Sequence, residues 1–387
     1  MEIIKTFGNY VEKWCEAQDL KFRLAPSKKI NSSDQYLARM MMNVMLQPLK
    51  HPDQSVLVSV FTPCELMQEA GLYPYNVESF SCYLTASSAE RAFLQSAEDS
   101  GLSETLCSYH KTFIGAAEKG LLPKCIVYTN LACDANLLTF QRLAEFFHVP
   151  VFSIDVPSGQ TSENVAYVAA QLRALRGFLE QTTGHQIDED KLVQRVKRGY
   201  KTLQQFDAFQ SARADRFIPS DLVSPLYSGM TNNILLGTEE EALYTEKLLQ
   251  DVKKAPPKKG KHIYWMHTIP FWSDAVKDAL LLNDDVQIVG CELSQATDIS
   301  RHSEDPYEEM AMRLIYHALN GPISRRINAG IRHAKQAGAD GVVWFNHWGC
   351  KHTLGGSRIA KKRFEDAGLP TLILDGDGCD RSHGGEG

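Results

Sequence analysis

Short apolar segments alternate with helix-forming segments twice along this chain, and this alternation restricts its fold more than any other feature. In the first half, apolar segments lie at residues 55–60, 125–129 and 151–155, and a helical pattern follows each one. Such alternation is typical of a parallel sheet, because each helix carries the chain back to the start of the next strand. We predict a first α/β domain over residues 1–160.

The same alternation begins again in the last third of the chain. The apolar segments there lie at residues 262–266, 286–290, 341–345 and 371–375. Helical patterns separate them, and the last helix is expected to start near Leu354. We predict a second α/β domain over residues 262–387. Both domains are expected to contain a Rossmann-like or flavodoxin-like parallel sheet.

The residues between these two series have a different pattern. Residues 161–252 are almost wholly helical, with apolar positions three and four apart and Gly184 where the first helix should end. Residues 253–261 (KKAPPKKGK) contain two prolines, one glycine and five lysines. This composition is typical of a solvated linker. We therefore predict that a helical segment and a linker join the two sheet domains.

Charge and hydropathy exclude several classes of partner. The net charge of −6 over 387 residues gives no broad basic surface for nucleic acid or for an anionic membrane. No segment contains the roughly 20 consecutive apolar residues that a membrane-spanning helix needs. The first residues also lack a charged-then-apolar export signal. We expect a cytoplasmic protein that binds neither nucleic acid nor membrane.

Cysteines gather after the predicted strands. The chain has nine cysteines, and five lie just after such strands: Cys64, Cys133, Cys291, Cys350 and Cys379. Open parallel sheets bind ligands at the carboxyl ends of their strands, so these thiols occupy positions where chemistry is expected. An odd number of cysteines without any C-x-x-C pair is not typical of a disulfide framework, a zinc ribbon or a thioredoxin-like site.

Three cysteines also precede predicted helices, namely Cys107, Cys133 and Cys350. Backbone N–H groups and the dipole at a helix start stabilise a thiolate, which is the form that binds iron–sulfur clusters. These residues favour a soft-metal or iron–sulfur site between the two domains. The alternative is a protein whose cysteines are small buried hydrophobes, as we interpret Cys15, Cys125 and Cys291, and which binds zinc or a nucleotide. No G-x-G-x-x-G motif supports the nucleotide version.

The order of several motifs resembles the 2-hydroxyacyl-CoA dehydratase and benzoyl-CoA reductase family, and within it a 2-hydroxyglutaryl-CoA dehydratase D-component-like subunit. The motifs cover nearly the whole chain and are TPCELMQEAGLYP, CSYHKTFIGAAEKG, CIVYTNLACDANLLTF, DVPSG, HWGCKHTLGG and GLPTLILDGDGCDRSHGGEG. The resemblance implies an oxygen-sensitive 4Fe–4S cluster with one open iron. Its ligands in this sequence would be Cys107, Cys133 and Cys350.

The resemblance also implies an activity, the removal of water from a 2-hydroxyacyl-CoA by a lyase. The β-proton of such a thioester is too weakly acidic for a side-chain base. One electron added to the thioester carbonyl gives a ketyl radical anion that expels the α-hydroxyl, and the β-proton then becomes acidic enough for general-base removal. The implied partners are a separate ATP-dependent iron–sulfur activator and a second subunit, either a paralogue (heterodimer) or another copy (homodimer). No P-loop motif occurs in this chain.

Three further residues are predicted to act on the substrate. Glu65, in the P-x-E-L motif, is expected to serve as an acid–base group or to position the hydroxyl. The alternative interpretation is that the negative charge of Glu65 stabilises the start of a helix. His347 and His352 flank Cys350 and are expected to protonate the leaving hydroxyl. Their alternative is a supporting role around the metal site or on the surface.

Two variants of this function stay open. The first variant is a low-potential ATP-coupled reductase, either one like benzoyl-CoA reductase or one with a double-cubane 8Fe–9S cluster. A double-cubane cluster needs six cysteine ligands, and the resemblance leaves Cys64, Cys82 and Cys379 as the additional three. The chain is alternatively a non-catalytic electron-relay subunit of a heterodimer. The family pattern continues beyond GGEG into a further helix, so the resemblance implies that a chain ending at Gly387 lacks that C-terminal helix.

Overall fold

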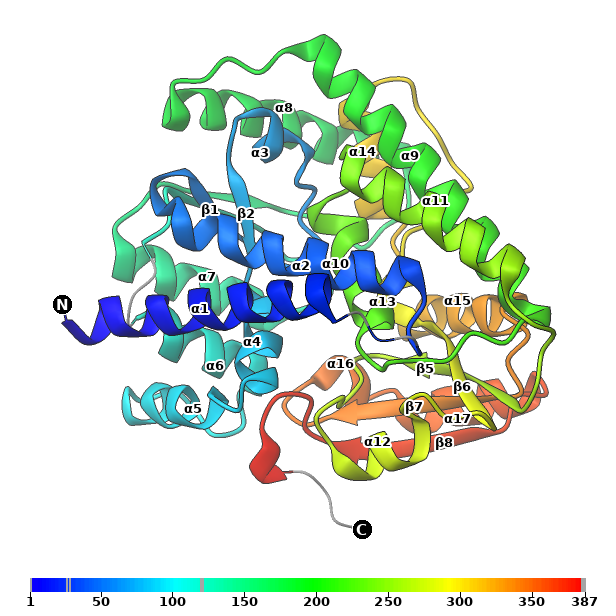
Figure 1. The fold of residues 1–387 in the computed structure, drawn as a ribbon. Coiled ribbons are helices and arrows are strands. Elements are labelled where there is room, and N and C mark those ends of the chain that lie inside the picture. The colour runs from blue at the N-terminus through cyan, green and yellow to red at the C-terminus, as the bar shows by residue number, and fades with distance from the viewer. Residues whose placement is uncertain (1, 26, 28, 119–121, 384–387) are drawn as a thin grey trace.

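Two parallel sheets organise the part of the chain that the computed structural model describes, which is residues 2–25, 27, 29–118 and 122–383 (Figure 1). The first sheet has the order β2-β1-β3-β4, with β1 (Ser55–Val58), β2 (Tyr73–Asn76), β3 (Cys125–Thr129) and β4 (Val151–Ile154). The second has the order β6-β5-β7-β8, with β5 (Lys261–Met266), β6 (Val286–Cys291), β7 (Gly341–His347) and β8 (Thr371–Gly376). All neighbouring strands run parallel. The predicted class, α/β with two parallel-sheet units, is confirmed.

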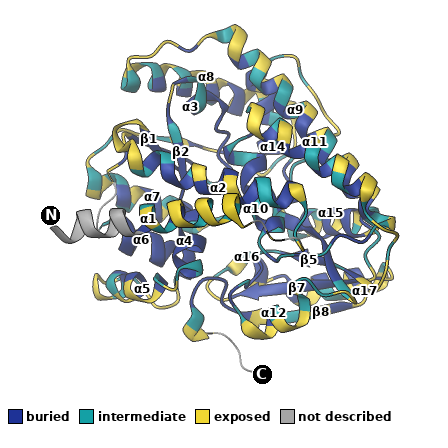
Figure 2. Ribbon diagram, viewed as in Figure 1, coloured by how far each residue is buried: buried dark blue, intermediate teal, exposed yellow. Residues whose placement is uncertain are grey.

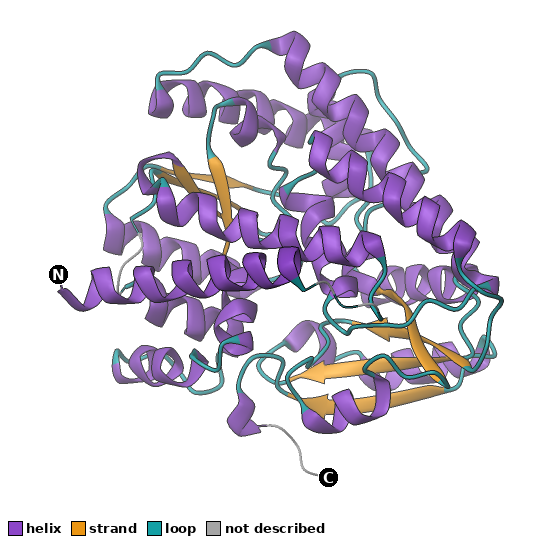
Figure 3. Ribbon diagram, in the orientation of Figure 1, coloured by secondary structure: helices purple, strands orange, loops and turns teal. Residues whose placement is uncertain are grey.

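Helices surround both sheets (Figure 3). They are α1 (Glu2–Leu24), α2 (Ser32–Lys50), α3 (Glu65–Glu69), α4 (Val77–Ala86), α5 (Glu90–Asp99), α6 (Ser108–Ala117), α7 (Asp134–Phe147), α8 (Ser162–Thr183), α9 (Glu189–Ala212), α10 (Ser224–Ile234), α11 (Glu239–Lys254), α12 (Asp274–Leu280), α13 (Glu292–Gln295), α14 (Pro306–Ile315), α15 (Ile323–Gln336), α16 (Lys351–Leu354) and α17 (Ser357–Asp366). Short 3-10 turns lie at η1 (Pro52–Gln54), η2 (Arg213–Asp215) and η3 (Arg381–His383). Among these helices, none combines the length and the apolar composition needed to cross a bilayer.

Alternate residues of the inner strands β1 and β7 enter different cores, which explains why these strands are mainly apolar. In β1, Leu57 joins the core formed with α2, α4 and α6, whereas Val56 and Val58 join the core formed with α8, α9 and α14. In β7, Val343 and Trp344 enter different clusters in the same way. The inner strands of each sheet are therefore covered on both faces, whereas the edge strands β4 and β8 are partly exposed (Figure 2).

Three details differ from the sequence prediction. Strand β2 was not predicted, because its sequence YPYN is short and contains Pro74, which a sheet tolerates only at an edge such as this one. The helix expected from Leu354 instead begins at Lys351 and breaks at two glycines into α16 and α17. The linker is confined to residues 255–260, since Lys253 and Lys254 end α11 and Lys261 begins β5.

The middle helices contact both sheet units. Helix α8 packs against α14 of the second unit, and α11 packs against α2 of the first. Helix α8 ends at Gly184 with a φ of 73°, as the sequence predicted. Residues of both sheet units contribute to one hydrophobic core, which includes β1 and α14. The predicted domain boundaries at residues 160, 252 and 261 therefore stay predictions. The last four residues, 384–387, and with them the GGEG segment, lie outside the described residues.

Candidate functional site

Cys107, Cys133 and Cys350 line one cavity of about 140 Å³. The cavity lies where the carboxyl ends of strands from both sheets face each other, since its wall includes Phe61 after β1 and His267 after β5. Parallel sheets bind ligands at these ends. The structure thus brings together three cysteines that are far apart in the sequence.

Each of these cysteines immediately precedes a helix, as the sequence predicted. Cys107, Cys133 and Cys350 are the N-cap residues of α6, α7 and α16. The loops that carry Cys107 and Cys350 are in direct contact, because a Cβ added at Gly349 would lie 2.8 Å from the Cys107 Cα. Gly349 also has a φ of +79°, so only glycine allows this approach of the two units without strain.

The three thiols are donors of the kind that an iron–sulfur cluster binds. Within the described residues, no three His, Cys, Asp or Glu side chains are close enough to one another to hold one ion. A cluster presents its iron atoms at separate corners, so its thiolates stand farther apart than the ligands of a single ion. Thiolate ligands drawn from distant parts of the chain are typical of such clusters. The donor set and its spread around one cavity are compatible with the predicted 4Fe–4S group.

A histidine lies beside each of the three sulfurs. The Nε2–Sγ distances are 3.1 Å for His347 and Cys107, 3.5 Å for His110 and Cys133, and 3.7 Å for His267 and Cys350. Only His347 was predicted as a site residue. His110 and His267 were missed because they lie on α6 and after β5, far in sequence from the cysteines that they contact.

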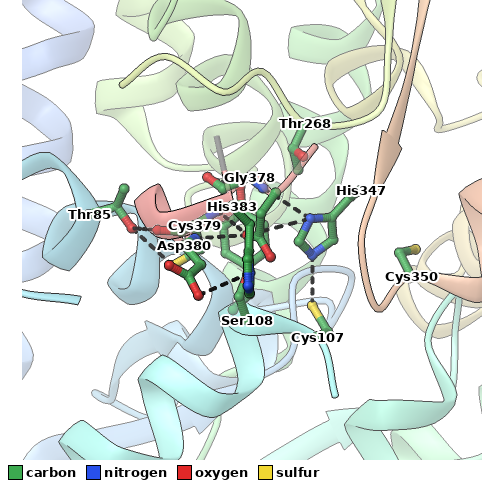
Figure 4. A network of polar contacts seen from close by, with 12 residues as sticks. Thr85, Cys107, Ser108, Thr268, His347, Cys350, Gly378, Cys379, Asp380 and His383 are labelled. Atoms are coloured by element: carbon green, nitrogen blue, oxygen red, sulfur yellow. Dashed lines mark hydrogen bonds and ion pairs between the residues drawn. The ribbon is translucent and has the colours of Figure 1, made fainter. Parts of the chain in front are cut away.

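His347 is oriented to donate a hydrogen bond to Cys107 (Figure 4). The backbone N–H of Gly378 donates to Nδ1 at 3.0 Å, so Nδ1 carries a lone pair. Burial lowers the pKa of His347, so the ring is neutral and its one proton lies on Nε2. That proton faces the Cys107 sulfur. This contact favours the alternative for His347, a supporting role at the sulfur, and its action on the hydroxyl stays a prediction.

The expected lowering of the thiol pKa values is wrong for two of the three cysteines. Burial raises the pKa of Cys133 to about 12, although the backbone N–H groups of Asn136 and Ala135 lower it. Burial also raises the pKa of Cys107 well above its usual value. Desolvation of the thiolate thus outweighs the helix start. Metal binding at these residues has to release protons, since the ligand form is the thiolate.

Glu65 lies away from the cavity, which does not support its predicted acid–base role. Its side chain is fully buried at the first position of α3 and forms an ion pair with Arg313 of α14. It does not line the cavity wall. The alternative interpretation, an acid at a helix start, fits this placement, with the added function of joining α3 to α14.

Replacing Arg313 with methionine should therefore destabilise the protein by about 3–5 kcal/mol, because Glu65 would be left as an uncompensated buried charge. Urea denaturation followed by circular dichroism measures this change. Arg173→Met is the control, since its ion pair with Asp305 is half exposed and should contribute about 1 kcal/mol or less. Equal losses in the two variants would contradict a structural role for the Glu65 pair.

His352 lines the cavity but is bound to Arg326. The Arg326 Nη1 lies 3.1 Å from His352 Nδ1 and donates to the His352 carbonyl oxygen at 2.8 Å. Burial and the positive charge of Arg326 both lower the pKa of His352. A neutral ring held in this way is suited to positioning, and its predicted proton donation stays a prediction.

Glu78 is a cavity residue that the sequence prediction missed. It lies in the first turn of α4, and the Asn76 side-chain amide donates to its carboxylate at 3.2 Å. Burial raises its pKa to about 7. A carboxyl group with this pKa both accepts and donates protons near neutral pH, which general acid–base catalysis requires. Glu78 follows β2 closely. Because β2 was not predicted, the sequence did not indicate that Glu78 lies at the end of a strand.

The raised pKa of Glu78 predicts a pH effect on stability. The group is protonated in the folded state below pH 7 and ionised in the unfolded state, so stability falls as pH rises through about 7. Between pH 6 and pH 8 this group should account for a loss of about 1 kcal/mol. Urea denaturation of the wild type and of Glu78→Gln at both pH values isolates the contribution of Glu78 to this loss of stability. The account is wrong if both proteins lose the same stability over this interval.

The six-cysteine alternative is poorly supported by position. Cys82 lines the cavity, whereas Cys64 and Cys379 do not. The Cys64 thiol donates to the Thr62 carbonyl oxygen at 3.2 Å, and the Cys379 sulfur lies 2.9 Å from Thr85 Oγ1. The geometry favours the set of three cysteines.

Comparison with known proteins places these residues in a family context. The sequence model described as 2-hydroxyglutaryl-CoA dehydratase, D-component, matches residues 59–386. The (R)-phenyllactyl-CoA dehydratase alpha subunit of Clostridium sporogenes is 22% identical over 214 residues, covering 52% of this chain and 52% of that protein. The (R)-2-hydroxyglutaryl-CoA dehydratase subunit alpha of Acidaminococcus fermentans is 25% identical over 277 residues, covering 67% of this chain and 56% of that protein. The chain thus spans about half the length of these curated relatives.

Proposed function

The chain belongs to the 2-hydroxyglutaryl-CoA dehydratase D-component family, and on this basis we propose that it is the iron–sulfur subunit of a 2-hydroxyacyl-CoA dehydratase. The observation that carries the proposal is the meeting of Cys107, Cys133 and Cys350 at one cavity between the two sheets. Both relatives are named as alpha subunits of such dehydratases, which supports the same general function here.

The three cysteines would hold a 4Fe–4S cluster, and the three histidines would support them. When bound, such a cluster would supply one-electron transfer and a Lewis-acidic iron beside the substrate. With the cluster bound, the N–H of His347 would stabilise the Cys107 thiolate by a hydrogen bond, and contacts of this kind tune a metal site.

Glu78 is proposed to transfer the protons of the dehydration. The substrate loses a hydroxyl from the α-carbon and a proton from the β-carbon, which together make one water. Neutral Glu78 can protonate the departing hydroxyl, and the resulting carboxylate can then take the β-proton. The residue ends in the protonation state in which it began. A pKa of about 7 makes both directions of transfer accessible.

The apolar part of the cavity wall would keep bulk water away from the reacting carbons. Phe61, Leu226 and Met230 contribute to this wall and are each buried. Water exclusion strengthens the electrostatic effect of Glu78 on the substrate, because the local dielectric constant is low.

Two partners belong to the proposal. One is a paralogous subunit, as the alpha-subunit names of the relatives imply. The other is an ATP-dependent iron–sulfur activator that delivers the first electron.

Turnover tests the proposal directly. The protein, purified without oxygen together with any co-purifying subunit, is mixed with a catalytic amount of titanium(III) citrate and with 2-hydroxyacyl-CoA thioesters of apolar and dicarboxylic acids. Mass spectrometry should show enoyl-CoA, one water lighter, in molar excess over the electrons added, because the electron is returned. Product formed in proportion to the electrons and carrying two extra hydrogens would instead identify a reductase. Turnover that requires a paralogous subunit and is unchanged by Glu78→Gln in this chain would identify the chain as an electron relay.

A further inference from the structure

The cavity has an unusual balance of charge for a site that takes an acyl thioester. Among the described residues that line it, Glu78 is the one carboxylate, and Arg326 is the one cation apart from histidines. Three of the histidines face cysteine sulfurs, and His352 contacts Arg326. Arg326 is therefore the one cation on this wall, histidines apart, that could form an ion pair with a negatively charged acyl side chain.

Arg326 is already fully engaged by other groups. Its Nε and Nη2 donate to the two carboxylate oxygens of Glu292, each at 2.6 Å, and its Nη1 donates to the His352 carbonyl oxygen at 2.8 Å. Its guanidinium also lies 4.7 Å from the ring centre of Trp344. The side chain is 1% exposed. A second carboxylate could bind Arg326 only by displacing Glu292, which would leave a buried charge unpaired.

One part of the wall is apolar and closely packed, while Asn76, Tyr109 and Thr268 are neutral polar groups elsewhere on it. Phe61, Leu226, Met230 and Leu319 line the cavity, and each is at most 8% exposed. Helix α10 approaches the chain at Leu293 so closely that a Cβ at Gly229 would lie 2.9 Å from the Leu293 carbonyl oxygen. The wall therefore has little room to rearrange around a hydrated charge.

We propose that this site takes 2-hydroxyacyl-CoA thioesters whose acyl side chain is uncharged and apolar, branched aliphatic or aromatic, and that it discriminates against the 2-hydroxyglutaryl thioester. The proposal rests on the proposed function, because it assumes that the acyl group enters this cavity. A distal carboxylate would meet an apolar wall, the Glu78 carboxyl and a cation that is already neutralised.

Equilibrium binding tests the proposal. Titration calorimetry without oxygen uses the protein with its co-purifying subunit and four ligands: 2-hydroxy-4-methylpentanoyl-CoA, phenyllactyl-CoA, 2-hydroxyglutaryl-CoA and coenzyme A. The two apolar thioesters should bind at least about tenfold more tightly than the glutaryl thioester. Equal or tighter binding of 2-hydroxyglutaryl-CoA would overturn the inference and leave the proposed function standing. If no thioester binds more tightly than coenzyme A, both the inference and the proposed function fail.

A variant with a free cation sharpens the test. Met230→Lys should add an unpaired ammonium group to the apolar wall and reduce the preference for apolar thioesters about tenfold. Met230→Leu keeps volume and polarity and should retain the wild-type preference. If Met230→Lys folds, judged by circular dichroism, and keeps the wild-type preference, the acyl group does not contact this wall. If it does not fold, the wild-type ratio and Met230→Leu decide the matter.

Discussion

Cys133→Ala should leave the protein folded but without its iron. The wild type is expected to contain about four irons per chain and the variant fewer than one, because three cysteines hold the proposed cluster and the loss of one opens it to solvent. The Cys133 side chain makes no capping hydrogen bond, so alanine should preserve α7. Iron and sulfide analysis of protein purified without oxygen measures the effect, and a thermal melt reports the fold.

Cys125→Ala is the matched control. Cys125 lies in β3, eight positions before Cys133, and is fully buried away from the cavity. The control should lose about 1 kcal/mol or more of stability from the small cavity it creates, yet keep its iron. Full iron content in Cys133→Ala, or equal loss in both variants, would show that the cluster is held elsewhere or that folding alone explains the result.

Glu78→Gln should lower turnover by about 10²–10⁴-fold without changing the iron content. The amide keeps the size of the side chain and can accept from Asn76, but it cannot transfer a proton. Steady-state formation of enoyl-CoA measures the loss, and calorimetry should show nearly unchanged thioester binding. A parallel loss of binding would instead indicate a role in holding the substrate.

Glu163→Gln provides the control for Glu78→Gln. Glu163 occupies the same position in the first turn of α8 that Glu78 occupies in α4, but it is exposed to solvent and far from the cavity wall. Turnover of this variant should match the wild type. A turnover of Glu78→Gln within a factor of about three of the wild type would remove Glu78 from the reaction, since general acid–base groups contribute far more.

The sequence predicted the fold well because the fold depends on local patterns. Seven of the eight strands lie in mainly apolar segments, and helix α8 begins after the capping residue Thr161 and ends at Gly184. Strand β2 lacks such a pattern, since Pro74 and Asn76 are typical of turns, and it forms only by pairing with β1.

The candidate site was harder to predict because it is built from tertiary contacts. The predicted helix starts pointed to the three cysteines, the resemblance to a family implied that they are ligands of one cluster, and the structure adds that they line one cavity. Nothing in the local sequence indicates that His110 contacts Cys133 or that His267 contacts Cys350. Glu65 shows the opposite error, since its motif is clear but its carboxylate is directed to Arg313 instead of the cavity.

The most direct test of the account is the position of iron in crystals grown without oxygen. Anomalous diffraction at the iron absorption edge locates iron atoms independently of any assumed ligand. The account predicts one iron–sulfur cluster in contact with the sulfurs of Cys107, Cys133 and Cys350, in the cavity that Glu78 also lines. Iron bound at other residues, or the absence of iron from crystals grown without oxygen, would contradict the account.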